Sequence, residues 1–242
     1  MRQQVDVLGV LARSYLFDGL AMDDLRPLAA VATTRALVRG EYLWRAGDPA
    51  EEIYVVASGE VKDFLLGSNG EELIHLLHGP GMTTGEPGYF AVERTRSVAE
   101  VAVMPAIVVR LDRRDLTPFM QRHPSVKDRA LEGLAGTVRW YGSVVMAMET
   151  RPLRERILLR LLDLVDAEAT GEAVTAAVSQ STLASMTGVS RENVNRALAG
   201  LMADGTIRRY GSKYVLTDVR RLRAELARDW PVLELRDRRR AT

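Results

Sequence analysis

The hydrophobic pattern of this 242-residue chain changes its period along the sequence, and this change limits the possible folds more than any other feature. From about Thr34 to Arg113, short apolar runs are separated by glycine-containing turn signals. The signals are Arg39-Gly40, Ala46-Gly47-Asp48-Pro49, Ser58-Gly59, Asn69-Gly70 and Gly79-Pro80-Gly81. This spacing is typical of the short strands of an all-β sandwich or roll. Asn69-Gly70 in addition predicts a hairpin between its flanking strands.

Patterns on either side of this region predict two short helices before it and a strand at its end. Residues 5–15 follow helical spacing, and the segment GLAMDDLRPLAAVA starts a second helix. Near the end of the β region, the alternation in AIVVRL places Ile107, Val109 and Leu111 on one face of a strand.

After His123-Pro124 the period becomes helical. Apolar residues then recur at alternating steps of three and four, at Leu131, Leu134, Val138, Tyr141, Val145 and Met148. This heptad seam predicts one long helix, from about Ser125 to Met148, that pairs with its copy in a homodimer. The alternative is a helix that packs only on its own domain. Thr150-Arg151-Pro152 then interrupts the pattern and predicts a hinge, because a residue before proline avoids the helical region.

The segment SQSTLASMTGVSRENVNRALAGLMADGTI predicts two helices joined by a tight turn. The first runs from Gln180 to Met186 and ends at Gly188, and Ser190 is a suitable N-cap for the second, which continues to about Ala203. This is the layout of a helix-turn-helix, whose second helix enters the major groove of DNA.

The second predicted helix has an apolar stripe and a polar face. The stripe consists of Val194, Leu198 and Leu201, and the opposite face carries Arg191, Glu192, Asn195 and Arg196. Arginine can donate twice to guanine, and glutamate can accept from cytosine. The alternative is a solvated face with an internal Arg–Glu pair. The next segment, TIRRYGSKYVL, predicts a hairpin wing that presents Arg208, Arg209 and Lys213 to phosphates.

Composition narrows the possible classes of protein. The chain has no cysteine, which excludes disulfides and thiolate metal centres. It has neither an apolar run long enough for a membrane span nor the apolar core of a signal peptide, so we expect a cytoplasmic protein. Acidic residues outnumber basic ones over residues 1–148, and the reverse holds over 149–242, which makes nucleic acid a candidate partner for the second part.

The segment GEPGYFAVERTRSVA, residues 85–99, predicts a ligand pocket. It brackets a turn-rich insert with Gly85-Glu86 on one side and Arg96-Ser97 on the other. A planar guanidinium binds phosphate bidentately, and a carboxylate accepts from hydroxyls. Together they suit a small anion that also carries hydroxyl groups. The alternative is an internal Glu86–Arg96 salt bridge in an empty pocket.

These features together resemble the CRP/FNR superfamily of bacterial regulators, over nearly the whole chain. The GE…RSVA segment matches the family's phosphate-binding cassette, and GVSRENVNRAL matches its recognition helix. The resemblance implies an α+β protein with a cyclic-nucleotide-binding β-roll (jelly roll) over residues 1–124, a dimerisation helix and hinge over 125–149, and a winged helix-turn-helix over 150–242.

The resemblance also implies roles for individual residues. Glu86 would accept the ribose 2′-hydroxyl and Arg96 and Ser97 would hold the cyclic phosphate. Other residues expected at the ligand are Gly85, Pro87, Gly88, Tyr141 and Gly142. Tyr141 and Gly142 stand where cyclic-AMP-responsive members have a Thr-Ser pair that meets the base, so base choice is open, and Trp140 or Tyr141 could instead stack on a base. The residues expected at DNA are Ser190, Arg191, Glu192, Asn195, Arg196, Arg208 and Lys213.

The implied function is that of a homodimeric transcription regulator, not an enzyme. A cyclic nucleotide, with cyclic AMP the first expectation, would act allosterically through the hinge, and the DNA site would be a TGTGA-like palindrome. The implied partners are double-stranded DNA, a second copy through residues 125–148 and RNA polymerase, with no metal and no membrane. Two alternatives remain: a regulator with the same fold and a vestigial pocket, and a nucleotide-binding regulatory subunit of another protein.

Overall fold

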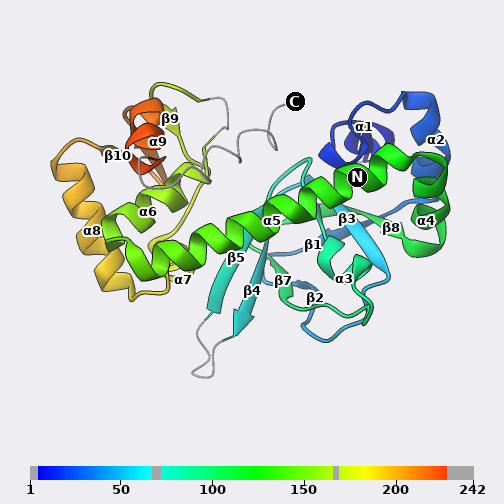
Figure 1. Cartoon of the computed structure of the whole chain (residues 1–242), viewed down its shortest axis with the longest axis horizontal. Coiled ribbons are helices and arrows are strands. Elements are labelled where there is room, and N and C mark those ends of the chain that lie inside the picture. Colours follow the sequence, from blue (N-terminus) through cyan, green and yellow to red (C-terminus); the bar gives the residue numbers. More distant parts are fainter. Residues whose placement is uncertain (1–4, 67–71, 166–168, 228–242) are drawn as a thin grey trace. The chain divides into compact units, whose positions relative to one another are not determined.

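The structure is a computed structural model that describes residues 5–66, 72–165 and 169–227 (Figure 1). These residues divide into two compact units, one formed mainly by residues up to Ala135 and the other by residues from Gly136 onward. Each unit is described by itself. No helix within the described residues is long and apolar enough to cross a membrane.

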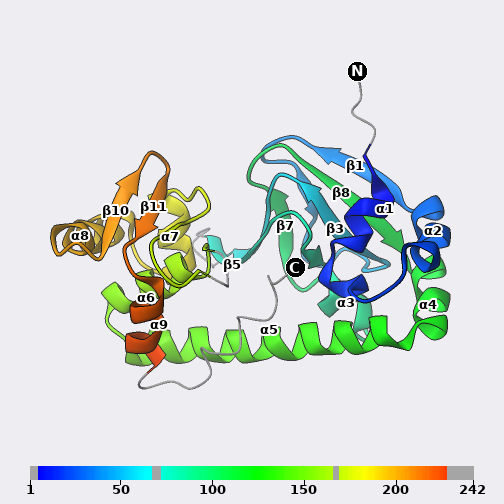
Figure 2. The same ribbon diagram turned by 90° about the horizontal axis from the view of Figure 1, so that it is seen from above.

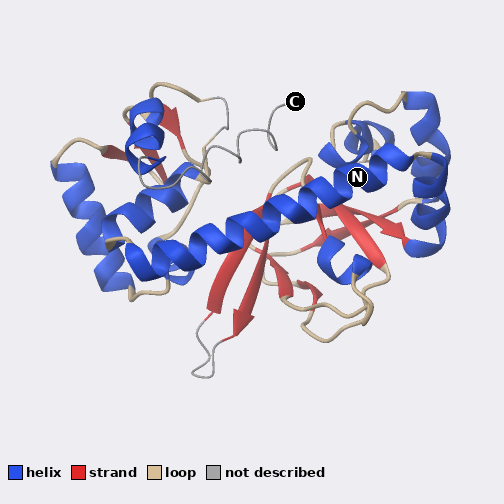
Figure 3. Cartoon of the chain, viewed as in Figure 1, coloured by secondary structure: helices blue, strands red, loops and turns tan. Residues whose placement is uncertain are grey.

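The first unit consists of eight strands with helices packed beside them (Figure 3). Its strands are β1 (Thr33–Leu37), β2 (Tyr42–Trp44), β3 (Glu52–Ser58), β4 (Val61–Leu66), β5 (Glu72–His78), β6 (Thr83–Thr84), β7 (Ala99–Ala102) and β8 (Ala106–Asp112). They form two antiparallel sheets of order β1-β8-β3-β6 and β2-β7-β4-β5. The predicted Asn69-Gly70 hairpin lies outside the described residues.

The sheet that contains β3 and β8 is buried on both faces. Along β3, Ile53 and Val55 face one apolar cluster and Tyr54 and Val56 face another, as expected from the two-residue period of a strand. The first cluster also holds side chains of the helices α1 (Val7–Ala12), η1 (Tyr15–Phe17), α2 (Met22–Val31) and α4 (Arg113–Arg122). Figure 2 shows α1, α2 and α4 gathered at one end of the strands. The second cluster fills the interior of the roll, between the two sheets.

The predicted strand at 106–112 is confirmed, with Ile107, Val109 and Leu111 on one face of β8. Val109 and Leu111 are buried in the cluster under the helices. Ile107 is only half-buried, and Ala106 and Val108 are buried in the roll interior on the opposite face. Both faces of β8 are therefore covered, which the alternation of apolar residues along the strand does not reveal.

Helix α5 (Pro124–Thr150) confirms the prediction of one long helix. Val126 and Ala130 near its start are buried in the core of the first unit. Half of its predicted seam is open to solvent in the single chain, since Leu131, Val138 and Val145 are 53%, 70% and 59% exposed. The other seam residues, Leu134, Tyr141 and Met148, are half-buried.

The second unit is a small helical domain with a three-stranded sheet. Besides the end of α5, its elements are α6 (Leu153–Leu162), β9 (Ala173–Val174), α7 (Gln180–Thr187), α8 (Arg191–Ala203), β10 (Ile207–Tyr210), β11 (Lys213–Leu216) and α9 (Val219–Ala227). The sheet has the antiparallel order β10-β11-β9. The basic tail, residues 235–242, lies outside the described residues.

Candidate functional site

The segment predicted to form the anion pocket lies between β6 and β7 in the first unit. Gly85 follows β6 with a φ of 100°, a left-handed conformation, and α3 (Glu86–Phe90) begins at the next residue. A Cβ on Gly85 would lie 2.5 Å from Nη1 of Arg96 and 3.1 Å from the carbonyl oxygen of Glu52. Glycine is therefore required here, both for the backbone conformation and for the close approach of Arg96.

Gly88 allows a second close approach, in the middle of α3. A Cβ at this position would lie 2.7 Å from the carbonyl oxygen of Thr95 and 2.8 Å from Cβ of Ala50. The residue before Arg96 is thus packed directly on α3. Because Gly85 and Gly88 have no side chain, Arg96 and Thr95 at the other end of the predicted cassette can lie directly against them.

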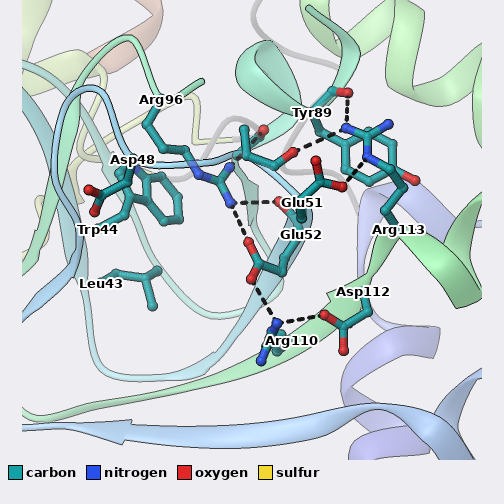
Figure 4. A network of polar contacts seen from close by, with 12 residues as sticks. Leu43, Trp44, Asp48, Glu51, Glu52, Tyr89, Arg96, Arg110, Asp112 and Arg113 are labelled. Carbon is teal, nitrogen blue, oxygen red and sulfur yellow. Dashed lines mark hydrogen bonds and ion pairs between the residues drawn. The ribbon is translucent and has the colours of Figure 1, made fainter. Parts of the chain in front are cut away.

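Arg96 is buried, with 3% of its surface exposed. Its Nη1 donates to the carbonyl oxygen of Gly85 at 3.1 Å, and its Nη2 donates to the carbonyl oxygen of Glu52 at 2.9 Å and to Oε2 of Glu52 at 3.0 Å (Figure 4). The guanidinium carbon lies 4.1 Å from the centre of the Trp44 ring. Burial lowers the pKa of Arg96, whereas the charge of Glu52 raises it. These contacts hold the guanidinium rigidly inside the roll.

The alternative of a Glu86–Arg96 salt bridge is wrong. The acidic partner of Arg96 is Glu52, which also accepts from Nη2 of Arg110 at 2.8 Å (Figure 4). Glu86 is half-buried and accepts a hydrogen bond from the hydroxyl of Thr83. Sequence reasoning missed Glu52, because it lies 44 residues before Arg96 and only the pairing of strands brings the two together.

Only two of the three guanidinium nitrogens of Arg96 are bonded within the described residues. Within the part of the chain that the structure describes, its buried Nε has no hydrogen-bond partner. A buried donor without a partner is unfavourable, so this nitrogen is a natural contact for an anion. Ser97 and Pro87 are exposed at the rim of the same segment.

Tyr141 and Gly142, the other expected ligand residues, lie on α5 in the second unit. Their relation to the cassette stays a prediction. The idea that Trp140 stacks on a base finds no support, because this ring is buried beneath the guanidinium of Arg160, whose carbon lies 4.8 Å from the ring centre. Arg160 also donates to the carbonyl oxygen of Met186 at 3.0 Å and so joins α6 to the end of α7.

A second polar cluster lies in the roll interior, formed by Asp63 on β4, His78 on β5 and Glu100 on β7. Burial raises the pKa of Glu100 to about 7, assisted by the charges of Asp63 and Glu86. Burial alone would lower the pKa of His78, but Glu100, Asp63 and Glu86 together raise it to about 9. The sequence did contain a signal for this cluster. Asp63 lies two residues after the core residue Val61 on the same strand, so both share the face that points into the roll.

This cluster predicts that the first unit becomes less stable as the pH rises. The folded pKa of Glu100 lies above the ordinary 4.5, so the stabilisation from its protonated form is lost as pH rises through about 7. The folded pKa of His78 lies above 6.5, so its contribution is complete below pH 6.5 and is lost as pH rises through about 9. We expect each of the two groups to lower the free energy of unfolding by on the order of 3 kcal/mol across its own pH range.

Urea unfolding followed by circular dichroism at three pH values would measure this dependence. A His78→Leu/Glu100→Leu double variant should give a flatter profile than the unchanged chain, because it removes both groups. An equally steep profile in the variant would show that other groups cause the pH dependence.

The helix-turn-helix of the second unit has the predicted layout. α7 ends at Gly188, which has a left-handed φ of 66°, and the hydroxyl of Ser190 caps α8 by accepting from the backbone nitrogen of Asn193. The apolar stripe is buried as expected, and the four polar residues of the opposite face are exposed. The stripe is Val194, Leu198 and Leu201, and the exposed residues are Arg191, Glu192, Asn195 and Arg196.

Two of these exposed residues have partners within the chain. Nη2 of Arg196 donates to Asn193 at 2.7 Å, and Asn195 accepts from the side chain of Gln180 on α7 at 3.1 Å. Such exposed contacts contribute little and can be exchanged for contacts to a ligand. Arg191 and Glu192 lie beside them in the first turn of α8.

The predicted wing is the hairpin of β10 and β11, which pair from Ile207–Leu216 to Tyr210–Lys213. Lys213 is exposed near the tip. Arg208 is also exposed, but it forms an ion pair of 2.5 Å with Glu172, which the sequence pattern did not predict. A DNA phosphate would have to compete with Glu172 for this arginine.

Comparison with known proteins identifies both domains. Residues 34–123 match the family model of the cyclic nucleotide-binding domain, and residues 155–225 match that of the Crp-like helix-turn-helix domain. The chain is 30% identical to the cyclic AMP receptor protein of Thermus thermophilus, over 81% of this chain and 88% of that protein. It is 29% identical to the CRP-like cAMP-activated global transcriptional regulator of Mycobacterium tuberculosis, over 88% and 96%.

Solved structures show the same architecture. FixK2 from Bradyrhizobium japonicum superimposes with a TM-score of 0.70 at 25% identity, covering 80% of this chain and 96% of that chain. The c-di-GMP responsive global regulator CLP from Xanthomonas campestris gives a TM-score of 0.67 at 25% identity, covering 81% and 99%. Both curated relatives match over most of their length, and the relative from Mycobacterium tuberculosis is a transcriptional regulator. The chain therefore belongs to the CRP/FNR family of transcription regulators, with a cyclic nucleotide-binding domain followed by a Crp-like helix-turn-helix domain.

Proposed function

We propose that this regulator is a homodimer whose DNA binding is controlled by a cyclic nucleotide bound in the β-roll. The supporting observation is the buried guanidinium of Arg96, which is held in place by Glu52 and Gly85 and keeps its Nε without a partner in the described structure. In this proposal Arg96 and Ser97 take the cyclic phosphate and Glu86 takes the ribose 2′-hydroxyl. Gly85, Pro87 and Gly88 complete the rim.

Cyclic AMP is the first effector to test, because one relative is a cAMP-activated regulator and another is a cyclic AMP receptor protein. The structurally similar regulator CLP is instead responsive to c-di-GMP. Calorimetric titration of the full chain with cyclic AMP, cyclic GMP and cyclic di-GMP would identify the effector class. If none of the three binds, the result favours the alternative, a regulator that binds DNA without a nucleotide.

We further propose that the exposed seam of α5 pairs with its copy, within residues 125–148. Three of its apolar side chains, Leu131, Val138 and Val145, are exposed in one chain, and a Cβ on Gly142 would meet nothing within 4 Å among the described residues. Burial of these side chains against a second copy of the helix would stabilise the dimer through the hydrophobic effect. Tyr141 and Gly142 would then lie at the dimer helix. A cytoplasmic location, with RNA polymerase as a further partner, fits this role.

The DNA site is proposed to be a palindrome with TGTGA-like half-sites, read by α8. Arg196→Ala should weaken binding to this palindrome by about 1–3 kcal/mol per half-site, with little effect on random DNA, because an arginine that reads guanine acts only on the right sequence. Fluorescence anisotropy with a TGTGA palindrome and with scrambled DNA would measure both affinities.

Arg208→Ala in the wing is the matched comparison. It should weaken binding to both DNAs about equally and make the salt dependence shallower, because a phosphate contact releases a counterion and reads no base. Titrations at two salt concentrations separate the two effects. If Arg196→Ala lowers both affinities by the same factor, α8 does not read the sequence.

A further inference from the structure

Two acidic side chains face each other inside the β-roll. Trp44 on β2, Glu100 on β7 and Asp63 on β4 occupy one cross-strand row, since Trp44 is paired with Glu100 and Glu100 is paired with Asp63. Glu100 is fully buried and Asp63 nearly so. Like charges directly opposite one another destabilise a sheet, and burial increases the cost. A purely structural row would be expected to hold apolar residues here.

Hydrogen bonds within the chain satisfy only part of this cluster. Oδ1 of Asp63 accepts from the backbone nitrogen of Leu76 at 2.5 Å, and Oε2 of Glu100 accepts from the hydroxyl of Thr84 at 2.6 Å. Nε2 of His78 lies 3.8 Å from Oδ2 of Asp63, which is an ionic contact but too long for a hydrogen bond.

Three buried polar atoms remain without a partner. Among the described residues, neither ring nitrogen of His78 has a hydrogen-bond partner, and neither does Oε1 of Glu100. Buried groups of this kind are rare in folded proteins and indicate a missing partner. The described residues contain no group of three or more acidic, histidine or cysteine side chains arranged to hold a metal ion. The atoms without a partner are an acceptor on Glu100 and the ring nitrogens of His78, which can donate N–H groups. They suit an organic ligand that offers an N–H donor and an acceptor next to each other.

One end of this row of side chains lies at the cassette. The guanidinium of Arg96, the proposed phosphate contact, lies over Trp44 at one end of the row. Thr84, which bonds Glu100, directly precedes the cassette, and the charge of Glu86 acts on both Glu100 and His78. A nucleotide with its phosphate at Arg96 and its ribose at Glu86 would have its base free to extend along this row.

We propose that Asp63, His78 and Glu100 form the base-reading subsite of the β-roll, which takes a purine with an N–H donor beside an acceptor on its Watson–Crick edge. Glu100 accepts from that N–H, and His78 donates to the neighbouring acceptor. Adenine offers its 6-amino group beside N1, and guanine offers N1–H beside O6. This inference rests on the proposed binding of a cyclic nucleotide at the cassette.

The subsite would place base recognition within the β-roll. The expected base contacts, Tyr141 and Gly142, carry only one side-chain polar group between them. A buried acceptor and a buried donor discriminate strongly, because a base that lacks the matching edge leaves them unpaired. The subsite therefore predicts that the effector is chosen by its base edge as well as by its phosphate.

Calorimetric titration of the full chain with three ligands tests this inference. The ligands are cyclic AMP, cyclic GMP and purine riboside 3′,5′-cyclic monophosphate, which has no N–H donor on its base edge. We expect the last to bind at least about tenfold more weakly than the better of the other two. That better ligand also identifies the base as adenine or guanine.

Substitution of Glu100 tests whether the proposed subsite causes this difference in affinity. Glu100→Met should weaken the better ligand about tenfold and leave the purine riboside derivative almost unchanged, so that the discrimination disappears. Glu93→Met, at an exposed glutamate of the same unit, should bind all three ligands as the unchanged chain does. If Glu100→Met does not fold, Glu100→Gln, which keeps a carbonyl acceptor, should fold and retain the discrimination.

The outcomes separate the two proposals. If the purine riboside derivative binds the unchanged chain as tightly as cyclic AMP and cyclic GMP, the cassette binds nucleotides and the subsite is overturned. If discrimination persists in Glu100→Met, another part of the chain reads the base and the subsite is also overturned. If no cyclic nucleotide binds, the proposed function fails, and this inference fails with it.

Discussion

Arg96→Leu is expected to abolish cyclic-nucleotide binding while the chain remains folded and dimeric. Arg96 is the one buried guanidinium of the cassette, and its free Nε is the donor best placed for a phosphate. Loss of charged hydrogen bonds to the phosphate should cost at least about 2 kcal/mol of binding free energy. Calorimetric titration of the variant with the effector that binds the unchanged chain measures this loss directly.

The fold should tolerate this change because Glu52 keeps a second cation. Oε1 of Glu52 remains bonded to Arg110 at 2.8 Å when Arg96 is removed, so no isolated carboxylate is left behind. Arg94→Leu is the matched control, since Arg94 lies two residues earlier and is exposed. It should leave affinity unchanged. Full affinity in Arg96→Leu would remove the basis for placing the phosphate at this residue.

The double substitution Val138→Asp/Val145→Asp should convert the protein to monomers. Both valines lie on the exposed seam of α5, one heptad apart. In a paired helix the two changes would bury four carboxylates, two from each chain, and burial of unpaired charge is strongly unfavourable. Sedimentation velocity at micromolar concentration would show the shift from dimer to monomer, with and without nucleotide. Binding to a palindromic site should be lost with it.

Val38→Asp/Val92→Asp is the control for the added charge. These valines are 68% and 93% exposed in the β-roll unit and lie off the seam, so the variant should sediment like the unchanged chain. An unchanged chain that is monomeric at micromolar concentration would contradict the assignment of the seam to a dimer interface.

Local patterns predicted the elements of this protein well. The heptad steps predicted α5, and the cap at Ser190 with the turn at Gly188 predicted the start of α8 and the end of α7. Such features depend on residues within a few positions of each other, so their physical causes can be read along the chain. The exposed arc of α8 followed from the same helical period.

Pairings between distant residues could not be read in this way. Glu52 was missed as the partner of Arg96, and Glu172 was missed as the partner of Arg208, because 44 and 36 residues separate them. Many acidic residues lie within the same reach of chain, and no local signal selects one of them. The pairing depends on which strands become neighbours.

By itself, the sequence determined the order of strand, long-helix and helix-turn-helix regions, together with the glycines and charged residues of the cassette, because these follow from period and spacing. Tertiary structure decided which charges meet inside the roll. The register of β2, β7 and β4 placed Trp44, Glu100 and Asp63 in one buried row. A strand alternates its faces every residue, but which face is covered, and by what, depends on the sheet that packs against it.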